Sequence, residues 1–124
     1  MSKYKNKKIE YDGIVFDSKK ELHRYWELLE LEKLNLIKQL QLQKKFVLQD
    51  KFKMNGKTIR AITYIADFYY YDIQKNCYIV EDVKGYRNEV YKIKKKLFQH
   101  RYGIDIVEIW EKELMMLYVK EKLA

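Results

Sequence analysis

Two stretches rich in aromatic and β-branched residues, residues 62–71 and 78–84, place the strongest constraint on how this chain folds. Such residues favour strands over helices, and the short interval between the two stretches fits a hairpin turn. Each predicted strand carries an acid where a core strand should be apolar, Asp67 in the first and Asp82 in the second. Because strand side chains alternate between faces, Asp82 and Lys84 point the same way. Buried charge is costly unless it is paired or binds a metal, so this cluster indicates a functional site.

The rest of the sequence predicts one domain of α/β (α+β) class, with a mixed sheet flanked by helices. Its 124 residues suit a single domain, and 48% apolar residues are enough for a core. Ser18 and Glu21 form a capping box, in which both side chains satisfy free backbone amides at the start of a helix. In chain order we expect a hairpin over residues 9–16, with its turn at Asp12 and Gly13, and then a helix from Ser18 to Asn35. Strands over 36–43 and 46–52 and a turn over 54–57 lead into the two strands described above, the second of which stops at Gly85. The chain then continues with a helix over 88–101 ended by Gly103, a strand over 104–110 and a short helix over 113–123.

Helical spacing assigns apolar side chains to the core. On the second strand, Glu81 alternates with Asp82, so we expect it to face the other way and to be solvated. Glu108 shares a face of the last predicted strand with Ile106. The side chains expected to face the core are Leu22, Tyr25, Trp26, Leu29 and Leu34 in the first helix, and Val90, Ile93 and Leu97 in the second.

The excess of basic over acidic residues indicates what kind of partner the protein binds. Lys and Arg number 26 against 18 Asp and Glu, a net charge of +8, and polyanions are the usual partners of so basic a chain. The alternative is a basic protein whose lysines are simply solvated. Residues 1–8 are predicted to be a basic and flexible arm, for which a solvated tail is favoured over a phosphate-binding arm. The predicted DNA-binding residues of the second helix are Lys92, Lys94, Lys95, Lys96 and Arg101.

The sequence also excludes some classes of protein. Cys77 is the single cysteine, which leaves no internal disulfide and no zinc site built on several cysteines. We find no secretory signal and no apolar run of the ~20 residues that a membrane-spanning helix needs. We therefore expect a cytoplasmic protein without a membrane partner.

The charged cluster has the chemistry of a site for Mg²⁺ or Mn²⁺. Hard divalent cations prefer oxygen ligands, which Asp67, Asp82 and the backbone carbonyl of Val83 would supply, and Glu21 would add a ligand directly or through water. Lys84 would position the attacking water or stabilise charge that develops on a phosphate. Each acid also has a purely structural interpretation: Glu21 completes the capping box, Asp82 pairs with Lys84 on an exposed strand, and Asp67 bonds to turn amides.

The order of these residues resembles the PD-(D/E)xK nuclease superfamily. Asp67 matches its motif Asp, Asp82 to Lys84 its acid-x-Lys, and Glu21 its frequent helical acid. Ala66 replaces the proline for which the superfamily is named. More narrowly, residues 16–21, 64–68, 80–85 and 91–98 resemble a small phage and prophage family of unknown function within that superfamily. The resemblance runs from residue 5 to about residue 110, and the last segment has no counterpart.

The resemblance implies that residues 1–124 form one nuclease-like domain with a restriction-endonuclease-like core. It implies a phage-type, Mg²⁺-dependent DNA endonuclease, with Glu21, Asp67, Asp82 and Lys84 as catalytic residues. By analogy with Holliday-junction resolvases of the superfamily, it also implies branched DNA as substrate and a homodimer. The alternative is a nucleic-acid-binding module that keeps the fold without hydrolysis, although such a module has no chemical need for Lys84.

Overall fold

The computed structural model describes residues 8–84 and 86–110. Three predictions lie outside these residues: the basic arm apart from Lys8, the stop at Gly85 and the closing helix over 113–123. The secondary structure elements, in chain order, are β1 (Ile9–Tyr11), β2 (Ile14–Phe16), α1 (Lys19–Lys33), β3 (Ile37–Gln49), β4 (Phe52–Met54), β5 (Lys57–Ile59), β6 (Ile62–Asp72), β7 (Cys77–Lys84), α2 (Glu89–Tyr102) and β8 (Val107–Trp110).

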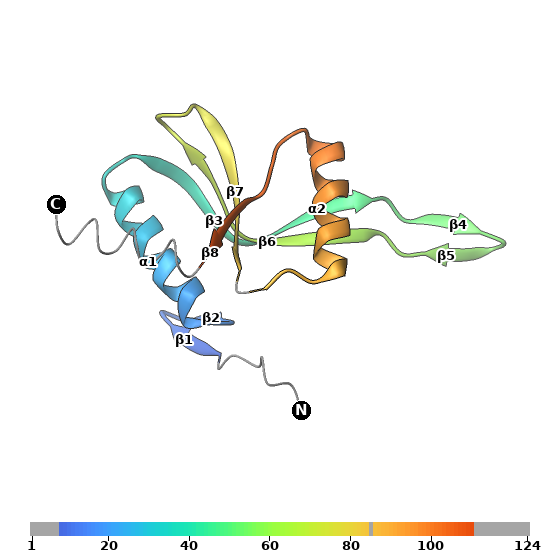
Figure 1. The fold of residues 1–124 in the computed structure, drawn as a ribbon, viewed down its shortest axis with the longest axis horizontal. Helices are drawn as coiled ribbons and strands as arrows, with labels where there is room; N and C mark the ends of the chain where they lie inside the picture. The colour runs from blue at the N-terminus through green and yellow to red at the C-terminus, as the bar shows by residue number, and fades with distance from the viewer. Residues whose placement is uncertain (1–7, 85, 111–124) are drawn as a thin grey trace.

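A mixed four-stranded sheet with the order β3-β6-β7-β8 forms the centre of the fold (Figure 1). β6 pairs antiparallel with both β3 and β7, whereas β8 pairs parallel with β7. A parallel pair needs a crossover connection, which α2 provides. The helices α1 and α2 flank the sheet, the short β1–β2 hairpin lies against α1, and the β4–β5 hairpin extends from the end of β3 and β6. This confirms the predicted α/β (α+β) class, with the mixed sheet and flanking helices expected of a restriction-endonuclease-like core.

Helix α1 begins and ends as the sequence predicts. The Ser18 side chain accepts a hydrogen bond from the backbone N–H of Glu21, and Asn35 follows the helix in the left-handed region at φ +59°. Tyr25 is buried as expected, but Trp26 is 40% exposed and lies against Tyr11 outside the core. The prediction for Trp26 was wrong because the buried side of α1 continues toward Leu28 and Arg24 instead. Leu34, also expected in the core, is the C-cap of α1 and is exposed.

Strand β3 is one element where the sequence predicts two. Lys44 and Lys45, which separate the predicted strands, pair with Ala66 and Ile65 in the β3–β6 ladder. Main-chain hydrogen bonds therefore hold the strand together across a polar stretch that carries no hydrophobic signal. Residues 50 and 51, expected in the second strand, lie between β3 and β4.

Two buried clusters make up the core, one beside each helix, and they meet at Asp67. Ala66 belongs to the α2-side cluster and Phe68 to the α1-side cluster. Lys44 of β3 pairs with Ala66 of β6, so Gln43 lies opposite Asp67. The backbone of Gln43 has a φ of +53°, which is unusual for a residue other than glycine. The α2-side cluster is Phe46, Leu48, Tyr64, Ala66, Val80, Tyr91, Phe98 and Ile106, and the α1-side cluster is Phe16, Leu22, Tyr25, Leu28, Ile37, Phe68 and Tyr70.

Helix α2 has the predicted ends but not the predicted inner face. Asn88 caps its start and Gly103 its end, at φ +70°. Val90 and Ile93 are about three-fifths exposed, whereas the buried side chains are Tyr91 and Phe98. The prediction of Val90 and Ile93 in the core was wrong because two large aromatic rings, seven residues apart on one helix face, bury more apolar area than the aliphatic side chains do.

The last described strand is shorter than predicted, since β8 begins at Val107 instead of Ile104. Ile106 is nevertheless buried in the α2-side cluster, and Glu108 follows it on the same face. Among the described residues, neither helix is long and apolar enough to span a bilayer.

Candidate active site

The structure brings together the four residues predicted to be catalytic, from three different elements. Glu21 lies in the first turn of α1, Asp67 in β6, and Asp82 with Lys84 in β7. Oδ2 of Asp67 accepts a hydrogen bond of 2.7 Å from the backbone N–H of Val83, which lies between the two β7 residues. Nζ of Lys84 lies 3.0 Å from Oδ1 of Asp82. Glu21 is close enough for the charges of Asp82 and Lys84 to act on its carboxyl.

Too much negative charge is gathered at this point for all the acids to ionise easily. Burial, and next the charges of Asp82 and Glu21, raise the pKa of Asp67 to about 8. Burial and the charge of Asp17 raise the pKa of Glu21 to about 7, although Lys84 opposes this. Lys84 brings positive charge to this group through its ion pair with Asp82 and its effect on Glu21. At neutral pH the site therefore favours an additional proton or cation.

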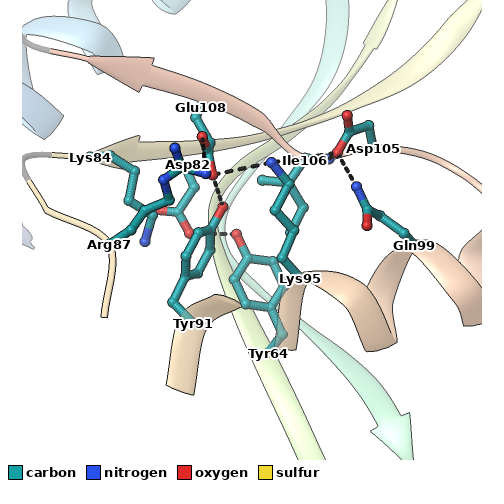
Figure 2. A network of polar contacts seen from close by, with 10 residues as sticks. All are labelled: Tyr64, Asp82, Lys84, Arg87, Tyr91, Lys95, Gln99, Asp105, Ile106 and Glu108. Carbon is teal, nitrogen blue, oxygen red and sulfur yellow. Dashed lines mark hydrogen bonds and ion pairs between the residues drawn. The ribbon is translucent and has the colours of Figure 1, made fainter. Parts of the chain in front are cut away.

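Aromatic side chains hold Asp82 and Lys84 in place (Figure 2). The Tyr64 hydroxyl donates a hydrogen bond of 2.5 Å to Oδ2 of Asp82. Nζ of Lys84 lies 3.5 Å from the centroid of the Tyr91 ring, a cation–π contact, and its side chain is only 14% exposed. Lys84 is thus fixed between a carboxylate and a ring, with its charge beside the acids.

Glu108 adds a further acid that sequence reasoning did not select. It is paired with Asp82 across the parallel β7–β8 ladder. It accepts hydrogen bonds from the Tyr91 hydroxyl at 2.8 Å and from Nζ of Lys95 at 3.2 Å, with Arg87 at 3.7 Å (Figure 2). Burial disfavours its ionisation, but the bonds from Tyr91 and Lys95 outweigh burial and lower its pKa. The alternation of Glu108 with Val107 was a visible signal; its partners on α2 were not.

The predicted DNA-binding residues of α2 have different surroundings. Lys95 turns toward β8 and pairs with Glu108, so it helps to hold the site network together. Lys92 pairs with Glu89 one turn away on the exposed surface. The exposed members of the set are Lys92, Lys96 and Arg101, and the half-buried ones are Lys94 and Lys95.

Glu81, expected to be solvated, is instead 1% exposed on the other face of β7. Its carboxylate accepts hydrogen bonds from Nε and a terminal nitrogen of Arg24 at 2.8 and 2.7 Å, and from the Tyr70 hydroxyl. The expectation was wrong because α1 covers this face and supplies the guanidinium that compensates the buried charge. Arg24 lies one helical turn after Glu21, a position that gave no sign of its partner.

The oxygen donors of the site fit Mg²⁺ or Mn²⁺ in kind. Mg²⁺ is usually held by one or two carboxylates together with substrate phosphates and water, so Asp67 and Asp82 are a sufficient protein contribution. Within residues 8–84 and 86–110, no group of three or more His, Cys, Asp or Glu side chains is placed to hold a metal ion. Both oxygens of Asp82 already have partners, Tyr64 and Lys84. The donor chemistry therefore fits a two-carboxylate site that substrate phosphate would complete.

Replacing Asp67 by Asn should stabilise the protein at pH 8 in the absence of divalent metal. The pKa of Asp67 in the folded state, about 8, is well above its ordinary value of 3.8. Between these values the folded state binds more protons than the unfolded state, so the free energy of unfolding falls as pH rises. Asn keeps an acceptor for the Val83 amide but cannot ionise. We expect a gain of at least ~1 kcal/mol at pH 8, and less at pH 5, by urea denaturation. The same pH dependence in both proteins would contradict this assignment.

Comparison with known proteins gives a family but no activity. The sequence matches the family model described as "Protein of unknown function (DUF1064)" over residues 1–116. Neither the curated proteins nor the solved structures compared with this chain gave a match. The matched region includes every described strand and helix and all the site residues named above. The chain therefore belongs to the DUF1064 family of proteins of unknown function.

Proposed function

We propose that this protein is a Mg²⁺-dependent endonuclease that hydrolyses phosphodiester bonds in DNA. The observation that carries the proposal is the convergence of two strand carboxylates, a helix carboxylate and a half-buried lysine at one point of the sheet. The charge of Asp82 helps to raise the pKa of both Asp67 and Glu21, and a divalent cation would offset that repulsion. An arrangement made only for stability would gain from apolar residues at these positions. The proposal includes membership of the PD-(D/E)xK superfamily, whose motif order the chain follows.

The residues have distinct roles in this proposal. Asp67, Asp82 and the backbone carbonyl of Val83 would hold Mg²⁺ or Mn²⁺, and Glu21 would contribute directly or through water. When bound, the ion would lower the pKa of a water molecule and offset charge on the scissile phosphate. Hydrolysis then joins the water oxygen to phosphorus and breaks the bond from phosphorus to a sugar oxygen, which takes up a proton. Lys84, held by Asp82 and Tyr91, would place its positive charge against the reacting phosphate.

The basic balance of the chain supports DNA as substrate. The net charge is +8, and Lys92 and Lys96 are exposed on α2, the helix that also supplies Tyr91 to the site. Lysines of this kind contact phosphates without reading sequence, so they would give affinity for DNA of any sequence. By resemblance we extend the proposal to branched DNA, a homodimer and a phage or prophage protein acting in the bacterial cytoplasm.

A cleavage assay is the direct test. The protein should cut linear, supercoiled, flapped or four-way DNA in the presence of Mg²⁺ or Mn²⁺ and leave it intact in EDTA. Asp67→Ala and Asp82→Ala should each abolish cutting while circular dichroism shows the fold retained. Glu30→Ala is the matched control, because Glu30 is an exposed carboxylate on α1 that pairs with Lys33 and belongs to neither the site nor the DNA-binding residues. DNA binding without cleavage under every metal tried would instead favour a binding module.

The same samples test metal binding without any reference to activity. A ligand that binds only the folded state stabilises it by about 2.7 kcal/mol at a concentration one hundred times its Kd. The wild-type melting temperature should therefore rise with added Mg²⁺ or Mn²⁺, and the rise should vanish in Asp82→Ala. If neither metal changes the melting temperature at millimolar concentration, the result counts against a metal site.

A further inference from the structure

The β4–β5 ribbon projects beyond the sheet and both helices (Figure 1). It continues the ladder between β3 and β6, because Gln49 pairs with Ile62 and, in the same register, Phe52 pairs with Ile59. Asn55 and Gly56 close it with φ of +51° and +75°, the signature of a tight hairpin turn. Every residue from 51 to 60 is exposed.

The two faces of this ribbon differ in chemistry. Alternation and pairing place Phe52, Met54 and Ile59 on one face, where they are 41%, 55% and 40% exposed. The opposite face carries Lys51, Lys53 and Arg60 around Thr58. Lys57 pairs with Met54 and so lies at the tip of the apolar face, and residues 51–60 together hold four basic side chains and no acidic one. The ribbon is therefore an amphipathic arm with a concentrated positive charge.

The base of the ribbon is tied to α2. A terminal nitrogen of Arg101 lies 3.4 Å from Asp50, and the Tyr102 hydroxyl donates a hydrogen bond of 2.7 Å to the carbonyl of Val47. An isolated two-stranded hairpin is at best marginally stable in water, so this anchoring and the continuous ladder are what keep the ribbon in place. Its direction is thereby fixed relative to the helix that carries Lys92 and Lys96.

We propose that the β4–β5 ribbon enters the major groove of duplex DNA beside the cleavage site. The DNA substrate in this inference rests on the proposed function. Two strands about 4.8 Å apart fit a major groove about 12 Å wide, whereas a minor groove about 6 Å wide has no room for their side chains. The apolar face then meets base edges and thymine methyl groups on the groove floor. The basic face lies at the groove rim, where Lys51, Lys53 and Arg60 reach the phosphates of both strands.

The test compares two variants that lose the same charge at different places. The ribbon variant is Lys51→Gln with Lys53→Gln and Arg60→Gln. The control is Lys33→Gln with Lys38→Gln and Lys75→Gln, which lie at the end of α1, the far end of β3 and the β6–β7 turn. Fluorescence anisotropy with a labelled 30-base-pair duplex, in EDTA at several salt concentrations, gives the Kd without cleavage. The ribbon variant should bind at least ten-fold more weakly, and its salt slope should fall by up to ~2.7 if three phosphates are no longer neutralised. The control should keep most of the affinity.

A second variant tests the groove itself. Replacing residues 51–60 by Asn-Gly continues the ladder, because residue 50 would then face residue 61 across a two-residue turn. Methylation of guanine N7, which obstructs the major groove, should weaken binding by the wild type and leave the shortened protein unaffected.

The possible results separate this inference from the proposed function. If the protein cleaves DNA but the ribbon and control variants bind DNA with equal affinity, the inference about the ribbon is wrong and the proposed nuclease activity is supported. If DNA binding depends on the ribbon but no metal supports cleavage, the ribbon inference is supported and the proposed nuclease activity is wrong. If the ribbon variants change the sedimentation of the protein but not its DNA affinity, the ribbon is a contact between two copies of the chain and the inference is wrong.

Discussion

Lys84→Ala should lower the rate of DNA cleavage by about 10²- to 10³-fold, the usual cost of removing one group that stabilises transition-state charge. Its DNA affinity should change little, because the Lys84 side chain is 14% exposed and is held between Asp82 and Tyr91. Single-turnover cleavage gives the rate of the chemical step, and anisotropy in EDTA gives the affinity. Lys84→Arg, which keeps the positive charge, should recover part of the rate.

The matched variant for this prediction is Lys92→Gln with Lys96→Gln, on the exposed surface of α2. It should weaken binding to every sequence and flatten the salt dependence by ~0.9 for each phosphate that is no longer neutralised, while the cleavage rate of saturated enzyme is kept. Lys95 is left unchanged because it pairs with Glu108 in the site network. A fully active Lys84→Ala protein, or one that loses affinity as badly as the α2 variant, would remove Lys84 from the catalytic residues.

Arg24→Ala should destabilise the protein severely, by about 3–5 kcal/mol. Glu81 would be left with its carboxylate 1% exposed and without the guanidinium that donates two hydrogen bonds to it. Urea denaturation at pH 7 measures the change. The loss should shrink at low pH, because an unpaired buried carboxyl takes up a proton more readily.

Two further variants give this prediction its controls. Lys33→Ala removes an exposed pair with Glu30, separated by 3.4 Å, and should cost no more than ~0.5 kcal/mol. Adding Glu81→Leu to Arg24→Ala should restore most of the lost stability, since the buried charge is then gone. If the double variant is as unstable as Arg24→Ala alone, packing of the arginine stem and not its charge accounts for the loss.

Local signals were enough to predict most of the elements and the central charged group, although β3 was predicted as two strands. Richness in aromatic and β-branched residues predicted β6 and β7, and the placement of Asp82 and Lys84 on one face follows from strand geometry alone. The capping serine and Gly103 located helix ends through backbone requirements that no distant contact changes. Asp67 was selected because it interrupts an apolar strand, and the structure places it beside the amide of Val83.

What the sequence did not reveal depends on partners far along the chain. The rotation of α2, which buries Tyr91 instead of Val90, is set by rings on β3 and β6 such as Phe46 and Tyr64. Glu81 is a surface acid in any local interpretation, and only the docking of α1 reveals its partner. For the same reason Glu108 was not selected, because its hydrogen-bonding partners are on α2 and its strand neighbour is on β7.

The parallel pairing of β7 and β8 has a consequence for the order in which the site is assembled. Asp67 and Asp82 meet through a hairpin, which closes a short loop at a small entropic cost. Glu108 reaches Asp82 only after the chain has crossed over the sheet through α2, a longer closure and one typical of slow folding. We therefore expect the carboxylates to gather while the chain is still partly open to water, and Tyr91, Lys95 and Glu108 to enclose them afterwards. In that order of folding, the repulsion between the acids first arises in a solvated hairpin, where it is weakest.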